Sequence, residues 1–266
     1  MQSAKDNDET TAGHHRGPRR PGYGRYAWRA AAVALAPVLL VQGLRVRRVT
    51  PRLPEPPGPR AGIAGHGPPL RLLIAGDSAA AGVGAPSQEA GLSGAVVREL
   101  ASEFSVSWRV EACNGLRTGG VLRRLGAIEP TPFDVVLLSL GVNDVTGGTR
   151  SAAWVVRQCQ LVDLLHDRFC ARHVLLTCLP PMHAFPALPQ PLRWVLGERA
   201  RQFTALLHAR IAVAPGCEVV TPQLPMNPAY MATDGFHPGP PAYAEWGREA
   251  AAIIRRRLAE EALPPR

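Results

Sequence analysis

Four short stretches of the sequence carry residues that could transfer an acyl group. "IAGDSAAAGVG" contains Ser78, and "ACNGLRTGG" contains Gly115. "LSLGVNDVTGG" contains Asn143, and "TDGFHPG" near the C-terminus contains Asp234 and His237, three residues apart. A serine hydroxyl becomes an effective nucleophile when an imidazole takes its proton and a carboxylate holds that imidazole in place. The stretches therefore predict a triad of Ser78, His237 and Asp234.

The same stretches supply hydrogen-bond donors for the negative charge that builds up on an ester carbonyl oxygen. We expect the backbone N–H groups of Ser78 and Gly115 and the side-chain amide of Asn143 to form this oxyanion hole. Gly119 and Gly120 are alternatives to Gly115. A serine that follows a strand can also be a simple helix N-cap, and Ser78 would then have no catalytic role.

The residues between these stretches predict the framework that brings them together. Apolar runs, expected to be strands, cover residues 70–75, 106–112, 134–140, 173–179 and 218–221. Helical patterns alternate with them at residues 88–103, 118–127, 151–169, 192–212 and 241–258. Continuous apolar strands that alternate with helices are typical of a parallel sheet covered on both faces, an α/β/α sandwich. Such sheets bind ligands beyond the carboxyl ends of their strands, where the first three stretches fall.

The ordered set of stretches resembles the four blocks of the SGNH, or GDSL, hydrolase family of esterases and lipases. The matching residues are Gly76-Asp77-Ser78, Gly115, Gly141-Val142-Asn143-Asp144 and Asp234-Gly235-Phe236-His237. The resemblance covers about residues 70–258. It implies a flavodoxin-like, five-stranded parallel sheet and a site without a metal or an organic cofactor, in which Asp77 steadies the nucleophile loop. An α/β-hydrolase is disfavoured because "GDSAA" lacks the last glycine of G-x-S-x-G.

The charge of the chain is concentrated near its N-terminus. Residues 1–60 hold 11 Lys and Arg against 4 Asp and Glu, whereas the rest of the chain holds 19 against 17. A nucleic-acid-binding domain would carry such an excess on a folded surface, so we expect no nucleic-acid partner. The expected regions are a disordered basic tail (1–27), an apolar membrane-associating segment (28–48), a Pro-rich linker (49–69) and the catalytic domain (70–266).

The apolar segment is expected to lie on a membrane rather than to cross it. Its uncharged part, residues 30–44, is shorter than the roughly 20 residues that a spanning helix needs. Arginines flank this part on both sides, so residues 16–48 are candidates for binding an anionic membrane surface. The alternatives are a helix packed on the catalytic domain and a cytoplasmic location.

Three smaller features complete the expectations. Residues 180–197 either form a wall over the substrate groove or pack on the core. The small residues 79–82 are expected to keep the start of a helix slim beside Ser78. The five cysteines follow no disulfide or zinc spacing and are expected to be buried free thiols.

The function expected from these features is that of a serine esterase acting on lipid or small acyl esters. One alternative is an O-deacetylase of cell-wall or polysaccharide acetyl esters, which would use the same residues in a different groove. The other is a non-catalytic, membrane-tethered binding module.

Overall fold

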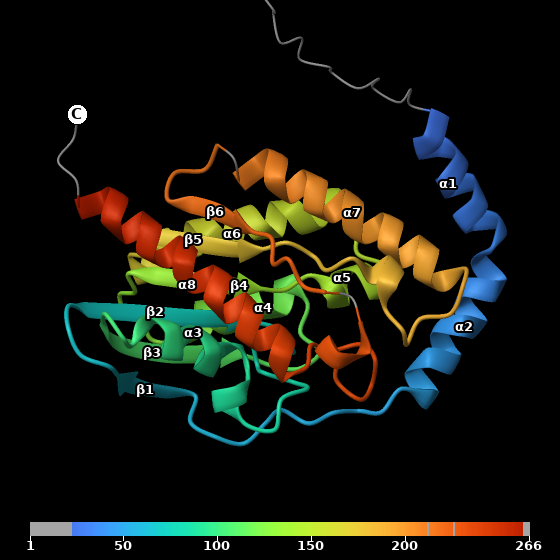
Figure 1. Cartoon of the computed structure of the whole chain (residues 1–266). Helices are drawn as coiled ribbons and strands as arrows, with labels where there is room; N and C mark the ends of the chain where they lie inside the picture. Colours follow the sequence, from blue (N-terminus) through green and yellow to red (C-terminus); the bar gives the residue numbers. More distant parts are fainter. Residues whose placement is uncertain (1–22, 212, 226, 263–266) are drawn as a thin grey trace, which may run out of the picture.

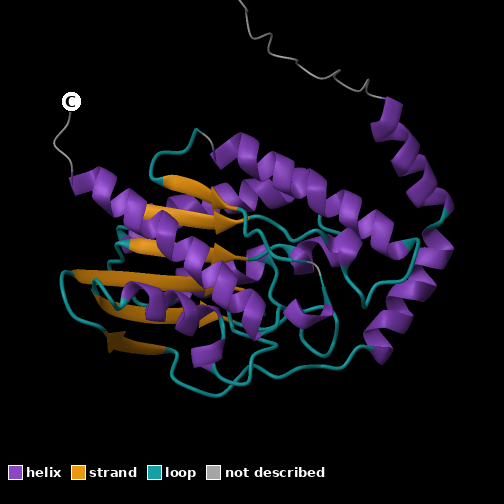
Figure 2. Ribbon diagram, viewed as in Figure 1, coloured by secondary structure: helices purple, strands orange, loops and turns teal. Residues whose placement is uncertain are grey.

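A single six-stranded sheet organises the chain in the computed structural model, which describes residues 23–211, 213–225 and 227–262 (Figure 1). The strands are β1 (Ala61–Ala64), β2 (Pro69–Gly76), β3 (Ser105–Ala112), β4 (Val135–Ser139), β5 (His173–Thr177) and β6 (Cys217–Val220). Their spatial order is β1-β3-β2-β4-β5-β6. All neighbouring pairs are parallel except β1 and β3, so five strands point their carboxyl ends to the same side of the molecule (Figure 2). The parallel part has the flavodoxin-like order.

Helices cover both faces of the sheet because neighbouring residues of each strand point to opposite faces. Leu72 and Ile74 of β2 pack in one core with α3 (Leu92–Leu100) and α8 (Pro240–Ala262). Leu73 and Ala75 pack in the other core with α4 (Thr118–Ala127), α6 (Ser151–Phe169) and α7 (Leu192–Ile211). The predicted three-layer α/β/α sandwich is therefore confirmed.

The sheet has one strand more than the five expected. The additional strand β1 pairs with the outer edge of β3 and comes from the segment expected to be a Pro-rich linker. Its sequence, AGIA, is too short to show an apolar period, which is why it was missed. The same segment is attached to the domain at two further points: Asn114 N–H donates to Glu55 at 2.6 Å, and Gln88 N–H donates to the Pro57 carbonyl at 2.8 Å.

The N-terminal region contains two helices, α1 (Tyr23–Ala34) and α2 (Ala36–Val49). Helix α1 begins inside the tail expected to be disordered over 1–27, and the rest of that prediction, residues 1–22, lies outside the described residues. Across the described part of the chain, no helix combines the length and the apolar character needed to cross a membrane.

Short helical turns join several of the main elements: η1 (Gln88–Ala90), α5 (Val142–Thr146), η2 (Met182–Ala184) and η3 (Pro228–Tyr230). The five cysteines are free, as expected, but none is buried: four are half-buried and Cys170 is exposed.

Candidate active site

Ser78 lies at the carboxyl end of β2, at the centre of the sheet. β2 ends at Gly76, where an added Cβ would overlap the carbonyl oxygen of Ser139 on the neighbouring strand β4. The glycine lets the two strand ends approach closely, and the N–H of Asp77 donates to the Ser139 carbonyl at 3.0 Å. The chain then leaves the sheet, and Ser78 is 8 % exposed at the edge of a pocket.

The small residues after Ser78 do not begin a helix. Residues 78–84 form consecutive turns, and the next long helix, α3, begins at Leu92. Ala80, Ala81 and Val83 are fully buried in the core under α8, and only Ala79 lines the pocket. The expectation of a slim helix start was therefore wrong, because these side chains are small to fit the core.

The loop before α8 holds His237 against Ser78. His237 Nε2 lies 2.9 Å from Ser78 Oγ, and His237 Nδ1 lies 2.5 Å from Asp234 Oδ2. Asp234 Oδ1 accepts the N–H groups of Phe236 and His237, both at 3.0 Å, which closes a tight turn around the carboxylate. Burial opposes ionisation of Asp234, but these hydrogen bonds and the adjacent imidazole outweigh it and hold its pKa below the ordinary value. With Asp234 ionised, Nδ1 carries a proton and Nε2 is free to accept the serine proton.

Two contacts fix the serine loop to the histidine loop. Gly84 has φ +100° and lies so close to the next loop that a Cβ would overlap the carbonyl oxygen of Pro238. The hydroxyl of Tyr243, in the first turns of α8, donates to the Val83 carbonyl at 2.6 Å. Both ends of the loop that carries Ser78 are thus held: one on the sheet, and the other on the segment that carries His237.

The structure brings Gly115 and Asn143 together beside the same strand ends. Asn143 Nδ2 donates to the carbonyl of Leu116, the residue after Gly115, at 3.0 Å and keeps a second hydrogen for another acceptor. Within the described part of the chain, the backbone N–H groups of Ser78 and Gly115 donate to no protein group. Gly115 is exposed, with nothing within 4 Å of the position a Cβ would take. Each of the three predicted donors therefore keeps one N–H hydrogen that no group in the described part of the chain accepts.

Asp144 connects α5, which carries Asn143, to the start of α4, which follows Gly115. It is fully buried, and its Oδ2 accepts both the N–H and the hydroxyl of Thr118 at 2.8 Å. Its Oδ1 accepts the hydroxyl of Thr149 at 3.0 Å. Every hydrogen bond of this carboxylate goes either to the start of α4 or to the turn after α5, which is a positioning role.

Asp77 is buried with only half of its carboxylate satisfied. Oδ1 accepts the N–H of Ala79 at 3.2 Å, while Oδ2 has no hydrogen-bond partner among the described residues. The N–H of Gly141 lies near and favours the ionised form, but it falls short of a good hydrogen bond. Burial dominates and raises the pKa of Asp77 to about 7, against the lowering effects of Ala79, His237 and Gly141.

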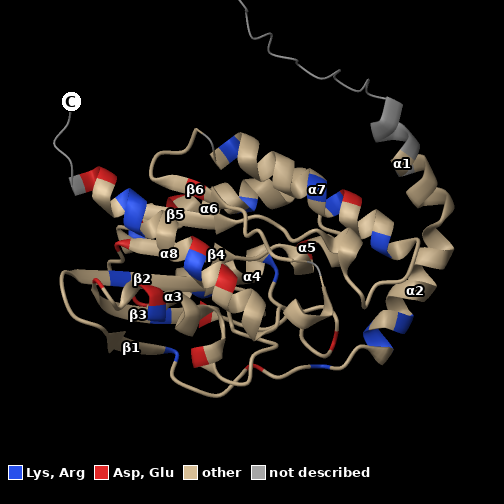
Figure 3. Cartoon of the chain, in the orientation of Figure 1, with Lys and Arg blue, Asp and Glu red and all other residues tan. Residues whose placement is uncertain are grey.

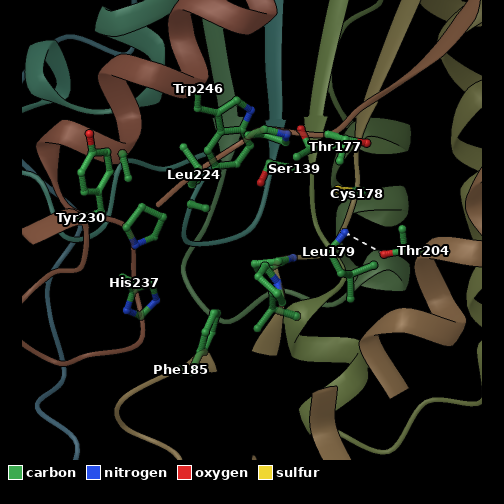
Figure 4. Close-up of a pocket in the computed structure, with 18 of the residues that line it drawn as sticks. Ser139, Thr177, Cys178, Leu179, Phe185, Thr204, Leu224, Tyr230, His237 and Trp246 are labelled. Atoms are coloured by element: carbon green, nitrogen blue, oxygen red, sulfur yellow. Dashed lines mark hydrogen bonds between the residues drawn. The ribbon is translucent and has the colours of Figure 1, made fainter. Parts of the chain in front are cut away.

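A pocket of about 790 Å³ opens beside Ser78 and His237. It extends along the carboxyl ends of β4, β5 and β6 as far as Thr204 of α7. Figure 4 shows side chains that line it. Most of these side chains are apolar, among them Leu179, Phe185, Leu224 and Trp246. The charged side chains on the lining, apart from His237, are those of Asp77 and Arg201. The pocket can therefore accept a sizeable apolar group next to the serine.

The segment after β5 has both of the roles considered for residues 180–197. Pro180, Pro181 and Phe185 line the pocket, while Met182 and Leu188 are buried in the core between the sheet and α7. Sequence reasoning missed the contributions of α7 and α8 to the lining. Thr204 and Trp246 lie inside amphipathic helical patterns, where a pocket residue cannot be told from a core residue.

Comparison with known proteins shows the family of the chain. Residues 74–245 match the model of the GDSL-like Lipase/Acylhydrolase family. The chain is 29% identical over 229 residues to the GDSL-like esterase Rv1075c of Mycobacterium tuberculosis (strain ATCC 25618 / H37Rv), covering 78% of this chain and 72% of that protein.

Two solved structures have a similar fold. The esterase EstA of Pseudoalteromonas sp., solved with monoethylphosphonate as inhibitor, has a TM-score of 0.55 and 23% identity, over 71% of this chain and 99% of that chain. A carbohydrate esterase family 2 enzyme of Corynascus thermopiles has a TM-score of 0.58 and 16% identity, over 78% of this chain and 69% of that chain. The family match extends over most of the folded domain, so the chain belongs to the GDSL-like lipase/acylhydrolase family and is a carboxylic ester hydrolase.

Proposed function

We propose that the chain hydrolyses carboxylic esters through an acyl-enzyme formed on Ser78, with His237 as general base and Asp234 as the carboxylate that orients it. The proposal rests on one observation above all: the unbroken series Ser78 Oγ, His237 Nε2, His237 Nδ1 and Asp234 Oδ2, with contacts of 2.9 and 2.5 Å. This series connects residues 159 positions apart in the sequence.

Each step of the proposed reaction uses a group already in place. Nε2 of His237 takes the hydroxyl proton as Ser78 Oγ bonds to the ester carbonyl carbon. The negative charge that forms on the carbonyl oxygen is stabilised by the N–H groups of Ser78 and Gly115 and the amide of Asn143. Collapse of this intermediate breaks the bond to the alcohol, which leaves with the proton from His237. Water then attacks the acyl-enzyme by the same route and releases the acid.

The substrate is proposed to be an ester with an apolar acyl group larger than acetyl. The support for this is the size and lining of the pocket beside Ser78. Each methylene that becomes buried contributes ~0.8 kcal/mol, which corresponds to about fourfold in kcat/KM if the pocket follows the chain. An O-deacetylase would need only a small acyl site. The likeness to the carbohydrate esterase extends to the fold alone.

The triad is tested with the purified full chain and p-nitrophenyl butyrate. Ser78→Ala and His237→Ala are expected to lower kcat by at least about 10⁴-fold. The matched controls are Ser102→Ala and His208→Ala, which alter exposed residues outside the site and are expected to keep full activity. A fluorophosphonate probe should label the wild-type protein and not Ser78→Ala. Retained activity in both triad variants would overturn the assignment, and an unlabelled wild-type protein would favour the binding module.

The acyl group is tested with a series of p-nitrophenyl esters from acetate to octanoate. The pocket predicts that kcat/KM rises with chain length over the first additions. A maximum at acetate, together with acetate release from acetylated polysaccharide, would instead support the O-deacetylase.

A further inference from the structure

The N-terminal helix α2 presents apolar side chains on two opposite faces. On one face, Leu39 and Val46 pack against the core of the catalytic domain. On the other, Leu40, Val41 and Leu44 are 65, 66 and 46 % exposed. One face is thus explained by packing within the chain, and the other covers nothing that the structure describes.

A hydrogen-bonded glutamine fixes the orientation of α2. Gln42 Nε2 donates to the Gln190 carbonyl at 2.6 Å, and Gln42 Oε1 accepts the N–H of Leu192 at 3.1 Å. Gln190 lies just before α7 and Leu192 is the first residue of α7, so both partners follow the segment that walls the pocket. Because both ends of one amide group are engaged, the outer apolar face is held facing away from the domain.

Exposed arginines accompany this outer face. Arg45, Arg47 and Arg48 occupy the last turns of α2, and Arg52 follows; Figure 3 shows the basic residues at this end of the helix. None of the four forms an ion pair with a residue that the structure describes. An apolar stripe with unpaired basic residues at one end matches an interface of hydrocarbon and negatively charged headgroups.

We propose that the outer face of α2, defined by Leu40, Val41, Leu44 and the arginines Arg45, Arg47 and Arg48, binds the surface of an anionic lipid bilayer. The charge favours lipid over a second copy of this chain, because a symmetric pair would bring two groups of arginines together. A helix that lies in the headgroup region needs no spanning length and buries only its apolar stripe.

The position of α2 has a consequence for catalysis, and this consequence rests on the proposed function. Helix α2 lies at the end of the molecule towards which the parallel strands point (Figures 1 and 2). The pocket is lined by residues at the carboxyl ends of β4, β5 and β6, on that same side of the sheet. A bilayer bound by α2 would hold the catalytic domain close to lipid esters.

The test is co-sedimentation of the full chain with phosphatidylcholine vesicles that contain or lack phosphatidylglycerol. We expect binding to the anionic vesicles, weaker binding to the neutral ones, and a decline as salt is added. Leu40→Glu with Leu44→Glu should abolish binding. Replacing Arg45, Arg47 and Arg48 by Gln should weaken it about 100-fold, at about fivefold for each arginine.

Matched control variants distinguish a specific role of the outer face of α2 in vesicle binding from general effects of adding or removing a charge. Val156→Glu changes a valine that is 54 % exposed on α6, and Arg123→Gln removes an exposed arginine of α4; both should bind like the wild type. All variants should hydrolyse soluble p-nitrophenyl butyrate at the wild-type rate, so a failure of the proposed catalysis is visible separately.

Two results would overturn the proposal. Equal binding of the wild type and the arginine variant to neutral and anionic vesicles would remove the role of charge. Absence of vesicle binding, together with a dimer in sedimentation velocity that Leu40→Glu dissociates, would assign the face to a second copy of the chain.

Discussion

The buried carboxyl group of Asp77 should make the protein less stable as the pH rises, and replacing it with asparagine should remove this dependence. The substitution Asp77→Asn introduces an almost isosteric neutral group, since the amide carbonyl can still accept the N–H of Ala79. The amide NH2 would take the place of Oδ2, which has no partner among the described residues. Any cost of burying that NH2 is the same at every pH, so the informative quantity is how the difference between Asp77→Asn and the wild type changes with pH.

The size and sign of the effect follow from the pKa of Asp77. Burial raises it from 3.8 to about 7 in the folded protein. A carboxyl group with a raised folded pKa contributes full stability below its unfolded pKa and loses that contribution as the pH rises through the folded value. At 1.36 kcal/mol for each pH unit, the total loss is about 4 kcal/mol. About 3 kcal/mol of it falls between about pH 5 and pH 8.

Urea unfolding followed by circular dichroism at several pH values measures this difference. The free energy of unfolding of Asp77→Asn should rise relative to the wild type by about 3 kcal/mol from pH 5 to pH 8. Asp167→Asn, which removes an exposed carboxylate on α6, is the control for a general change of charge. A difference that stays constant with pH would mean that Asp77 is already ionised at pH 5, and the reasoning from burial would be refuted.

Substitution of the neighbouring residues Asn143 and Asp144 should affect different properties, catalysis in the first case and stability in the second. Asn143→Ala is expected to lower kcat by about 10²–10³-fold with little change in stability, because it removes one donor to the developing oxyanion. A comparison of kcat with the urea midpoint checks this, and an unchanged kcat would contradict it. Asp144→Ala is expected to lower the free energy of unfolding by about 3 kcal/mol, since it leaves the buried N–H and hydroxyl of Thr118 and the half-buried hydroxyl of Thr149 without their acceptor. Denaturation by urea measures that loss, and a loss below about 1 kcal/mol would argue against the positioning role.

Much of the fold and of the candidate site could be predicted from the sequence because its signals are local. The apolar runs predicted the five parallel strands, since a strand buried on both faces must be apolar throughout. The predicted site residues follow strand ends or form the loop before the last helix. A parallel sheet gathers strand ends at one edge, so Ser78 and Asn143 were expected to be close before any contact was known.

The missed features depend on contacts that leave no local pattern. Strand β1 is four residues long and exists through its pairing with β3. The turns after Ser78 resemble a helix start in composition, and their side chains pack against α8, which is distant in the sequence. The half-satisfied Asp77 and the attachment of α2 by Gln42 both depend on residues distant in the sequence. Contacts between residues distant in the sequence leave no trace in the local spacing of apolar residues, so they cannot be predicted from it.

The hydrogen bond between Tyr243 and Val83 helps to make the catalytic geometry independent of the shape of the substrate pocket. The reacting pair is fastened to β2 and the start of α8, whereas much of the cavity wall belongs to α7 and to the loops after β5 and β6. Substitutions in that wall can therefore reshape what fits without moving the serine away from the imidazole. Because the reacting residues and much of the cavity wall belong to different elements, single substitutions in the wall can change the substrate while the nucleophile stays functional.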